Sequence, residues 1–213
     1  ENTVIGDRAF GAHPELVSKL GIQVMKGIQE QKIISVVKHF PGHGDTLVDS
    51  HEDLPRVYYD LERLKSFELI PFSQAIANNA DAIMLAHILL PKIDPDYPAT
   101  FSEALINGVI RKGMNYDGVV ITDDMTMGAI AENYDIGEAA VKSIRSGSDI
   151  VLVCNDFDKE VAVLKAIHAA AETGIIPSDR IDESVCRILK LKEKYALADQ
   201  QTESMDVQSI NAE

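Results

Sequence analysis

Short apolar runs alternate with longer amphipathic segments along most of this chain. The apolar runs span residues 33–37, 82–86, 118–121 and 150–153, and each is followed by polar side chains. Runs of this length with almost no polar residue are typical of strands covered on both faces of a parallel sheet. The pattern therefore predicts strands whose C-terminal ends carry polar groups, and α/β proteins build their active sites at that edge of the sheet.

Segments with apolar residues three and four positions apart lie before, between and after these strands. This spacing predicts helices over residues 15–29, 61–79, 102–112, 137–146, 159–173 and 178–195. Strands that alternate with helices of such length indicate βαβ units, and hence an α/β fold with a parallel sheet. The last residues are polar and lack helical spacing, so we expect one domain over residues 1–197 and a linker or disordered tail over 198–213.

Composition narrows the class of protein. With 46% hydrophobic and 25% charged residues the chain can bury a large core. Its formal net charge of −14 opposes binding to nucleic acid or to an anionic membrane surface. No apolar run approaches the ~20 residues needed to span a bilayer. The two cysteines, Cys154 and Cys186, are too few for a disulfide framework, and they leave the localisation unknown.

One segment concentrates titratable side chains. Residues 38–45 read Lys-His-Phe-Pro-Gly-His-Gly-Asp, and Asp49 and His51 follow shortly after. Packing alone does not require such a density of imidazoles and carboxylates. Pro41, together with Gly42 and Gly44, predicts that this segment is a loop beyond the strand over residues 33–37.

Two other predicted strand ends carry candidate chemistry. Asp123 and Asp124 follow the strand over residues 118–121, and His87 follows the strand over 82–86. A carboxylate at such a position can act as a nucleophile or can cap the following helix. Spacing does not separate Asp123 from Asp124.

The sequence carries no cofactor signature, because it lacks both a dinucleotide-binding fingerprint and a phosphate-binding loop. A zinc site remains an alternative, since neutral imidazoles of His39, His43 and His51 are suitable ligands. Pro41 and Gly42 are incompatible with a helix at this point, so such a site would have to be built from loops.

These motifs together resemble a known family. Residues 38–46, Asp49-Ser50-His51, Thr122-Asp123-Asp124-Met125 and Gly128-Ala129 are similar to the barrel domain of glycoside hydrolase family 3, in its β-N-acetylglucosaminidase (β-hexosaminidase) branch. The resemblance implies a (β/α)8 TIM-type barrel that removes terminal N-acetylglucosamine from peptidoglycan fragments or chitin-type saccharides. Such a barrel typically takes ~250 residues and eight strands. We therefore expect only its later strands and helices here, a partial barrel that lacks its N-terminal side.

The resemblance also implies roles for individual residues. Asp123 would be the catalytic nucleophile, because the family motif places the nucleophile directly after the Thr or Ser. His51 would be the acid/base, and Asp49 would orient its imidazole. An unperturbed imidazole has a pKa near ~6.5, so it can give up and take back a proton near neutral pH.

Arginine, lysine and histidine side chains near the C-terminal ends of the predicted strands would donate hydrogen bonds to the sugar. The candidates are Arg8, Lys38 and His39, with His87 a weaker fourth. For Arg8 the alternative is an ordinary ion pair with Asp7 or another acid.

Two further residues of the loop have a different expected role. We expect His43 and Asp45 to brace the loop from within and leave them outside the catalytic set.

Other functions stay open. A chain with four or five strands cannot close a barrel alone, so it would need the missing barrel segment or a second chain. It could equally be a folded but inactive fragment or a binding module. Within the family, β-glucosidase activity or phosphate in place of water as acceptor are further alternatives. For localisation, the branch includes cytoplasmic forms and longer exported forms.

Overall fold

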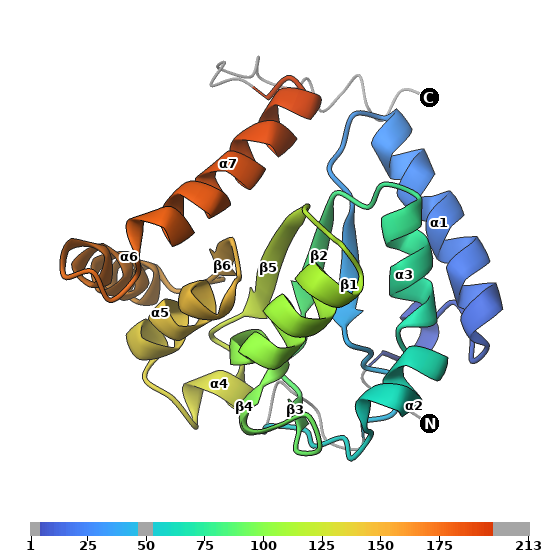
Figure 1. Ribbon diagram of the computed structural model, residues 1–213, viewed down its shortest axis with the longest axis horizontal. Coiled ribbons are helices and arrows are strands. Elements are labelled where there is room, and N and C mark those ends of the chain that lie inside the picture. The colour runs from blue at the N-terminus through green and yellow to red at the C-terminus, as the bar shows by residue number, and fades with distance from the viewer. Residues whose placement is uncertain (1–4, 47–52, 198–213) are drawn as a thin grey trace, which may run out of the picture.

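The computed structural model describes residues 5–46 and 53–197. Helices and strands alternate along the chain, as the hydrophobic pattern predicts (Figure 1). In chain order the elements are η1 (Gly6–Arg8), α1 (Pro14–Glu30), β1 (Val36–Phe40), α2 (Leu61–Ser66), α3 (Ile70–Ala77), β2 (Ala82–Leu85), β3 (Leu89–Leu90), β4 (Asp94–Pro98), η2 (Ala99–Phe101), the π-helix η3 (Ala104–Gly113), β5 (Val119–Asp124), α4 (Gly128–Ala131), α5 (Ile136–Ser146), β6 (Ile150–Leu152), α6 (Phe157–Glu172) and α7 (Ser178–Lys194).

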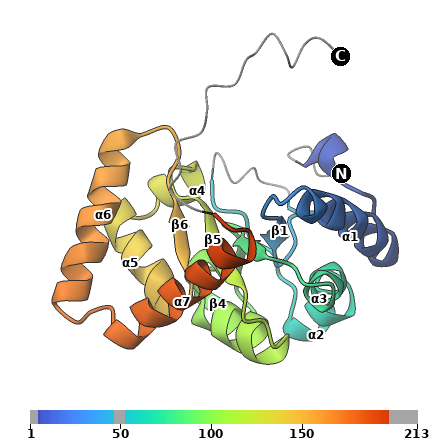
Figure 2. The same ribbon diagram turned by 90° about the horizontal axis from the view of Figure 1, so that it is seen from above.

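A parallel sheet forms the centre of the molecule. In the described part of the chain it has four strands in the order β1-β2-β5-β6, and Ile83 of β2 pairs with Val37 of β1 and Val120 of β5. Helices α1 and α3 lie on the β1 side of the sheet, and α5 lies beside β6 with α6 packed against α5 (Figure 2). The predicted α/β fold with a parallel sheet is confirmed. Strands β1 and β6 are the edges of this sheet, which is open within the described residues.

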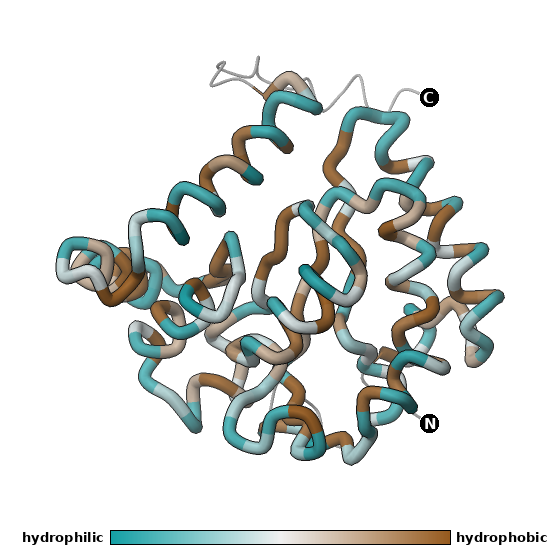
Figure 3. Tube along the Cα trace, viewed as in Figure 1, coloured by the Kyte–Doolittle hydropathy of each residue, from teal (hydrophilic) through white to brown (hydrophobic). Residues whose placement is uncertain are grey.

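Hydrophobic burial holds the sheet to its helices. Ile83, Leu85 and Val120 on the central strands are fully buried, and Leu105 and Ile110 of η3 pack in the same cluster. Figure 3 shows the hydrophobic colour concentrated on these strands, whereas α7 is mostly hydrophilic. Burying side chains of this size contributes roughly 1.5–3 kcal/mol each, so the central strands dominate the stability of the fold.

The first strand differs from its prediction. It runs over Val36–Phe40 instead of residues 33–37, and Ile33 and Val36 are 59% and 41% exposed. The expectation of a strand buried on both faces is therefore wrong for this element, because β1 is an edge strand. As a consequence Lys38 and His39 lie on the strand itself and not in the loop beyond it.

Three other elements depart from the predicted pattern. The single helix expected over residues 61–79 is two helices, because Pro71 lacks a backbone N–H and is tolerated only in the first turn of α3. The helix expected over residues 102–112 is a π-helix. The antiparallel hairpin of β3 and β4 was not predicted, since its prolines mask the strand signal.

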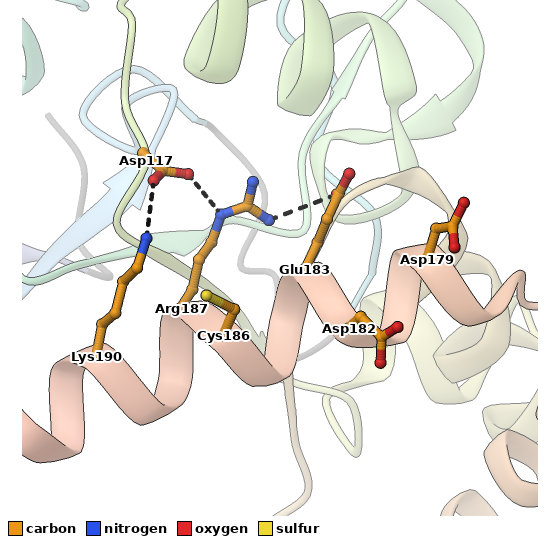
Figure 4. Close-up of a pocket in the computed structure, with 7 residues that line it drawn as sticks. All are labelled: Asp117, Asp179, Asp182, Glu183, Cys186, Arg187 and Lys190. Carbon is orange, nitrogen blue, oxygen red and sulfur yellow. Dashed lines mark hydrogen bonds and ion pairs between the residues drawn. The ribbon is translucent and has the colours of Figure 1, made fainter.

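Helix α7 closes the N-terminal ends of the strands through charged side chains. The carboxylate of Asp149, just before β6, is fully buried and accepts hydrogen bonds from Arg111, Arg180 and Arg187. Asp117, just before β5, contacts Arg187 and Lys190 along one face of α7, and Arg187 also contacts Glu183 (Figure 4). We call Asp149, Arg111, Arg180 and Arg187 the arginine cluster.

Asp81, just before β2, makes the equivalent connection to the end of α7. Its carboxylate accepts hydrogen bonds from Lys194 and Tyr195, and from Ser35 and Gln29 on the other side. Burial by itself would raise the pKa of Asp81, but these hydrogen bonds outweigh it and lower the pKa to about 2. This end of the sheet is thus built for stability.

No helix in the described part of the chain is both long and apolar enough to cross a membrane. The expected tail over residues 198–213 lies outside the described residues.

Candidate active site

Polar side chains from four strands meet at the C-terminal edge of the sheet. Because the strands are parallel, the ends of β1, β2, β5 and β6 all lie at this edge, opposite the arginine cluster. His39 lies near the end of β1, Asp123 and Asp124 end β5, and His87 and Cys154 come two residues after β2 and β6. The sequence prediction that these strand ends come together is confirmed.

Asp123 and His39 face each other across β2. His39 Nε2 lies 3.7 Å from Asp123 Oδ2, and the two side chains are 12% and 16% exposed. Burial lowers the pKa of His39 to about 4, although the carboxylate of Asp123 acts in the opposite direction. His39 is therefore neutral at pH 7, and its contact with Asp123 is not an ion pair.

Asp124 is held in a different way from its neighbour. Its Oδ1 accepts hydrogen bonds from the backbone N–H groups of Thr126 and Cys154, both at 3.0 Å, and its Oδ2 accepts one from the Thr126 hydroxyl at 2.7 Å. Both oxygens are thus occupied within the protein. The backbone N–H of Asp124 in turn donates to Asp123 Oδ1 at 2.8 Å, which leaves Asp123 Oδ2 facing His39.

His87 is buried directly behind these carboxylates. It is 1% exposed, its Nδ1 lies 2.7 Å from the Thr100 hydroxyl oxygen, and its Nε2 lies 2.9 Å from the backbone carbonyl oxygen of Asp124. Burial lowers the pKa of His87. Both ring nitrogens have partners within the protein, which favours a positioning role over the direct sugar contact expected from the sequence.

The other predicted sugar-binding residues line one cavity. Arg8 on η1 and Lys38 and His39 on β1 lie along a groove of about 930 Å³. The positive charges of Lys38 and Arg8 also act on the imidazole of His39 and lower its pKa further, so all three groups lie within electrostatic reach of one another. The structure thus brings Arg8, Lys38 and His39 to one groove, and His39 also contacts Asp123.

The loop after β1 is braced as the sequence predicts. His43 is buried with its Nδ1 2.8 Å from the Thr46 hydroxyl, and the Tyr59 hydroxyl donates a hydrogen bond to Asp45. A Cβ atom at Gly42, where φ is +134°, would lie 3.2 Å from Cβ of Glu68, so both the backbone conformation and the space favour glycine there.

Two predicted catalytic residues, Asp49 and His51, lie outside the described residues, so their assigned roles remain predictions. Among residues 5–46 and 53–197 no group of three or more His, Cys, Asp or Glu side chains could hold a metal ion. The zinc alternative involves His51 and remains open for that reason.

Sequence reasoning missed the threonines at this edge. Thr126 donates hydrogen bonds to both carboxylate oxygens of Asp124, from its backbone N–H to Oδ1 and from its hydroxyl to Oδ2, and Thr100 contacts His87. The Asp-x-Thr spacing of residues 124–126 is a recognisable turn signal and could have identified Asp124 as the structural member of the pair. No sequence signal places Thr100, because its contact depends on the β3–β4 hairpin.

Comparison with known proteins places this geometry in a family. Residues 1–191 match the family model described as "Glycosyl hydrolase family 3 N terminal domain". A "Beta-hexosaminidase" from Hydrogenovibrio crunogenus is 39% identical over 181 residues, which cover 85% of this chain and 50% of that protein. The chain spans about half the length of the curated relatives it matches, from about a third to somewhat over half.

Solved structures give the same result. A glycoside hydrolase family 3 β-N-acetylglucosaminidase from Paenibacillus sp. str. FPU-7 is 45% identical with a TM-score of 0.91, covering 96% of this chain and 40% of that one. A zinc-bound CbsA from Thermotoga neapolitana is 34% identical with a TM-score of 0.84, covering 91% and 42%. The chain therefore belongs to glycosyl hydrolase family 3.

Proposed function

We propose that this chain carries the catalytic edge of a retaining glycoside hydrolase that removes terminal β-linked N-acetylglucosamine from peptidoglycan fragments or chitin-type oligosaccharides. The observation that carries the proposal is the contrast between the two carboxylates at the end of β5. Asp124 has both oxygens occupied by hydrogen bonds, whereas Asp123 Oδ2 has only the contact with His39 Nε2 at 3.7 Å and its side chain is 16% exposed. Relatives named β-hexosaminidase support the choice of sugar.

Asp123 would act as the nucleophile. Its Oδ2 attacks the anomeric carbon as the bond to the departing oxygen breaks, and a covalent glycosyl-enzyme intermediate forms. The hydrogen bond from the Asp124 N–H to Oδ1 orients the carboxylate and leaves Oδ2 for the attack. A neutral His39 suits this chemistry, because a cation at the same place would stabilise the free carboxylate and weaken it as a nucleophile.

His51 would be the acid/base, with Asp49 orienting it. In the first step the imidazolium gives its proton to the departing oxygen, and in the second the neutral imidazole takes a proton from the water that releases the sugar. The chain carries these residues directly after the braced segment that ends at Thr46. Arg8, Lys38 and His39 would donate hydrogen bonds to the hydroxyl and acetamido groups.

The sheet itself would form part of a (β/α)8 barrel. Strands β1 and β6 are parallel edge strands with unpaired backbone groups in the described part of the chain, and further parallel strands could pair with both. Helix α1 also exposes an apolar stripe over Leu16, Leu20, Val24 and Ile28. The remaining barrel segment or a second chain would cover these surfaces, and an inactive fragment is the alternative for the chain by itself.

Hydrolysis of an aryl β-N-acetylglucosaminide tests the proposal. The 213-residue chain is assayed alone and together with the remaining barrel segment of a relative, with Asp123→Ala and Asp124→Asn beside it. We expect Asp123→Ala to abolish hydrolysis and Asp124→Asn to retain part of it. An aryl β-glucoside and added phosphate distinguish β-glucosidase and phosphorylase activities. Loss of the activity in Asp124→Asn with full activity in Asp123→Ala would contradict the assignment.

A loop-built zinc site is the second candidate function, because one relative is described as zinc-bound. The measurement is the zinc content of the chain after dialysis, compared with that of His51→Ala. A stoichiometric metal lost in the variant would favour a loop-built site.

A further inference from the structure

His87 is a buried titratable group at the catalytic edge that the proposed mechanism does not use. It lies 1% exposed between Thr100 and Asp124, and it emerges from the end of the central strand β2. A buried imidazole with two well-placed partners has a defined tautomer, and that tautomer decides what the ring can hold in place.

The partners of His87 determine where its proton lies. The backbone carbonyl of Asp124 can only accept a hydrogen bond, so Nε2 of His87, at 2.9 Å, must carry a hydrogen. In the neutral ring Nδ1 then lacks a hydrogen and accepts one from the Thr100 hydroxyl at 2.7 Å. The Thr100 hydroxyl also lies 3.1 Å from the Ala86 carbonyl oxygen. When the His87 ring is neutral, the single hydrogen of this hydroxyl points to Nδ1, which is the nearer acceptor.

The charged groups around His87 do not reverse this assignment. Burial lowers its pKa, and the largest opposing influences are the hydrogen bond to the Asp124 carbonyl and the carboxylates of Asp123 and Asp124 on β5. His43, from the loop after β1, lowers the pKa further. The ring is neutral at pH 7.

We propose that His87 is a positioning residue, whose Nε2–H fixes the backbone of Asp124 so that the Asp124 N–H holds the Asp123 carboxylate in its attacking orientation. Three separate groups then hold Asp124. His87 holds its carbonyl, Thr126 and Cys154 hold its carboxylate, and its own N–H is left to hold Asp123 Oδ1 at 2.8 Å. This role rests on the proposed function of Asp123 as nucleophile.

Two amide variants separate the two sides of the ring. In His87→Gln the side-chain amide nitrogen can reach the position of Nε2 and still donate to the Asp124 carbonyl. In His87→Asn the shorter amide reaches only the position of Nδ1, so the bond to Asp124 is lost while the contact with Thr100 is kept. Both variants place an amide in the same buried site, so each controls for the general effect of the substitution on folding, and their melting temperatures are compared directly.

The kinetic arm compares these variants on the aryl β-N-acetylglucosaminide. We expect His87→Asn to lower kcat by about 10- to 100-fold with KM nearly unchanged, because small displacements of a reacting group are costly while sugar binding is not altered. His87→Gln should recover most of that loss. Equal losses in both variants, or a rise in KM in place of the fall in kcat, would overturn the proposal.

The second arm does not depend on activity. In the chain labelled with ¹⁵N-histidine, the ring resonances of His87, identified by their loss in His87→Gln, should show hydrogen on Nε2 at pH 7, and the pKa of the ring should lie below the ordinary value of an imidazole. The carboxyl carbon resonance of Asp123 should shift in His87→Asn and not in His87→Gln. A hydrogen on Nδ1, titration near pH 6.5, or an unmoved Asp123 resonance would each contradict the inference. Absence of hydrolysis in the wild-type chain combined with the remaining barrel segment would instead count against the proposed function, and the resonances would still decide the role of His87.

Discussion

The two ends of the parallel sheet use aspartate in opposite ways. At the N-terminal end Asp149 is fully buried and accepts hydrogen bonds from three arginines, which leaves its carboxylate without a free direction. At the C-terminal end Asp123 is 16% exposed, has one oxygen held by a backbone N–H, and faces a neutral imidazole with the other. A carboxylate whose two oxygens are fully hydrogen-bonded within the protein stabilises the fold. A carboxylate with one oxygen not fully hydrogen-bonded is a candidate for chemistry.

The largest expected effect is on catalysis at the C-terminal end. Asp123→Asn keeps the shape of the side chain but removes the proposed nucleophile, so kcat on the aryl N-acetylglucosaminide should fall by about 10⁴-fold or more. The melting temperature should change little, because Asp123 makes few contacts that stabilise the fold. Steady-state kinetics and thermal denaturation measure the two effects. An Asp123→Asn variant that loses stability but keeps its activity would show that Asp123 stabilises the fold, as Asp149 does.

The matching variant at the other end is Asp149→Ala. It leaves Arg111, Arg180 and Arg187 without their common partner in a buried site, so we expect the free energy of unfolding to fall by about 3–5 kcal/mol. Activity per folded molecule should be retained. Urea denaturation measures the change, with the exposed Asp182→Ala on α7 as the control that should lie within about 0.5 kcal/mol of wild type.

A smaller and mixed effect is expected for Asp124, which lies at the catalytic edge but is fully bonded. Asp124→Asn loses an acceptor for the Thr126 hydroxyl or for an N–H group, so the free energy of unfolding should fall by about 1–3 kcal/mol. The value of kcat should fall far less than in Asp123→Asn. Equal kinetic losses in the two variants would show that the hydrogen-bond pattern does not separate the carboxylates.

Mild acid should weaken the C-terminal end first. His39 has a pKa of about 4 in the folded chain and about 6.5 when unfolded, so the unfolded state binds more protons between these values and stability falls as the pH falls from 6.5 towards 4. Between pH 7 and 5 this loss amounts to about 2 kcal/mol. His87 acts in the same direction, since burial lowers its pKa as well.

Urea denaturation of wild type and His39→Gln at pH 7 and pH 5 measures the contribution of His39. The pH dependence should be weaker in His39→Gln by about 2 kcal/mol over this interval. His168→Gln on α6 is the control for the replacement of a histidine, because that side chain is 74% exposed. An unaltered pH dependence in His39→Gln would mean that His39 is protonated in the folded chain.

The sequence predicted the central strands and the candidate residues at the C-terminal end of the sheet, but it misplaced the first strand. Apolar runs located the central strands β2 and β5 well, because both strands are buried on both sides. The same rule misplaced β1, since an edge strand does not need a continuous apolar run. The motif indicated Asp123, His39, Lys38 and Arg8 as candidates, but it could not show which of the two aspartates has both oxygens hydrogen-bonded within the protein.

The cluster at the N-terminal end was missed altogether. Its members, Arg111, Asp149, Arg180 and Arg187, are separated by up to 76 residues (111 to 187) and lie in segments that look like ordinary charged helix faces and loops. Long-range partners of this kind follow from the topology, in which α7 returns across the N-terminal ends of β2, β5 and β6.

The most direct test of the account is to identify the residue that becomes glycosylated. The chain, combined with the rest of the barrel if it is inactive alone, is treated with a fluorinated N-acetylglucosaminyl fluoride that slows release of the sugar, and the labelled peptide is sequenced by mass spectrometry. We expect a sugar attached to Asp123 and no label in Asp123→Asn. A sugar on Asp124, or turnover with inversion of the anomeric centre and no covalent adduct, would contradict it.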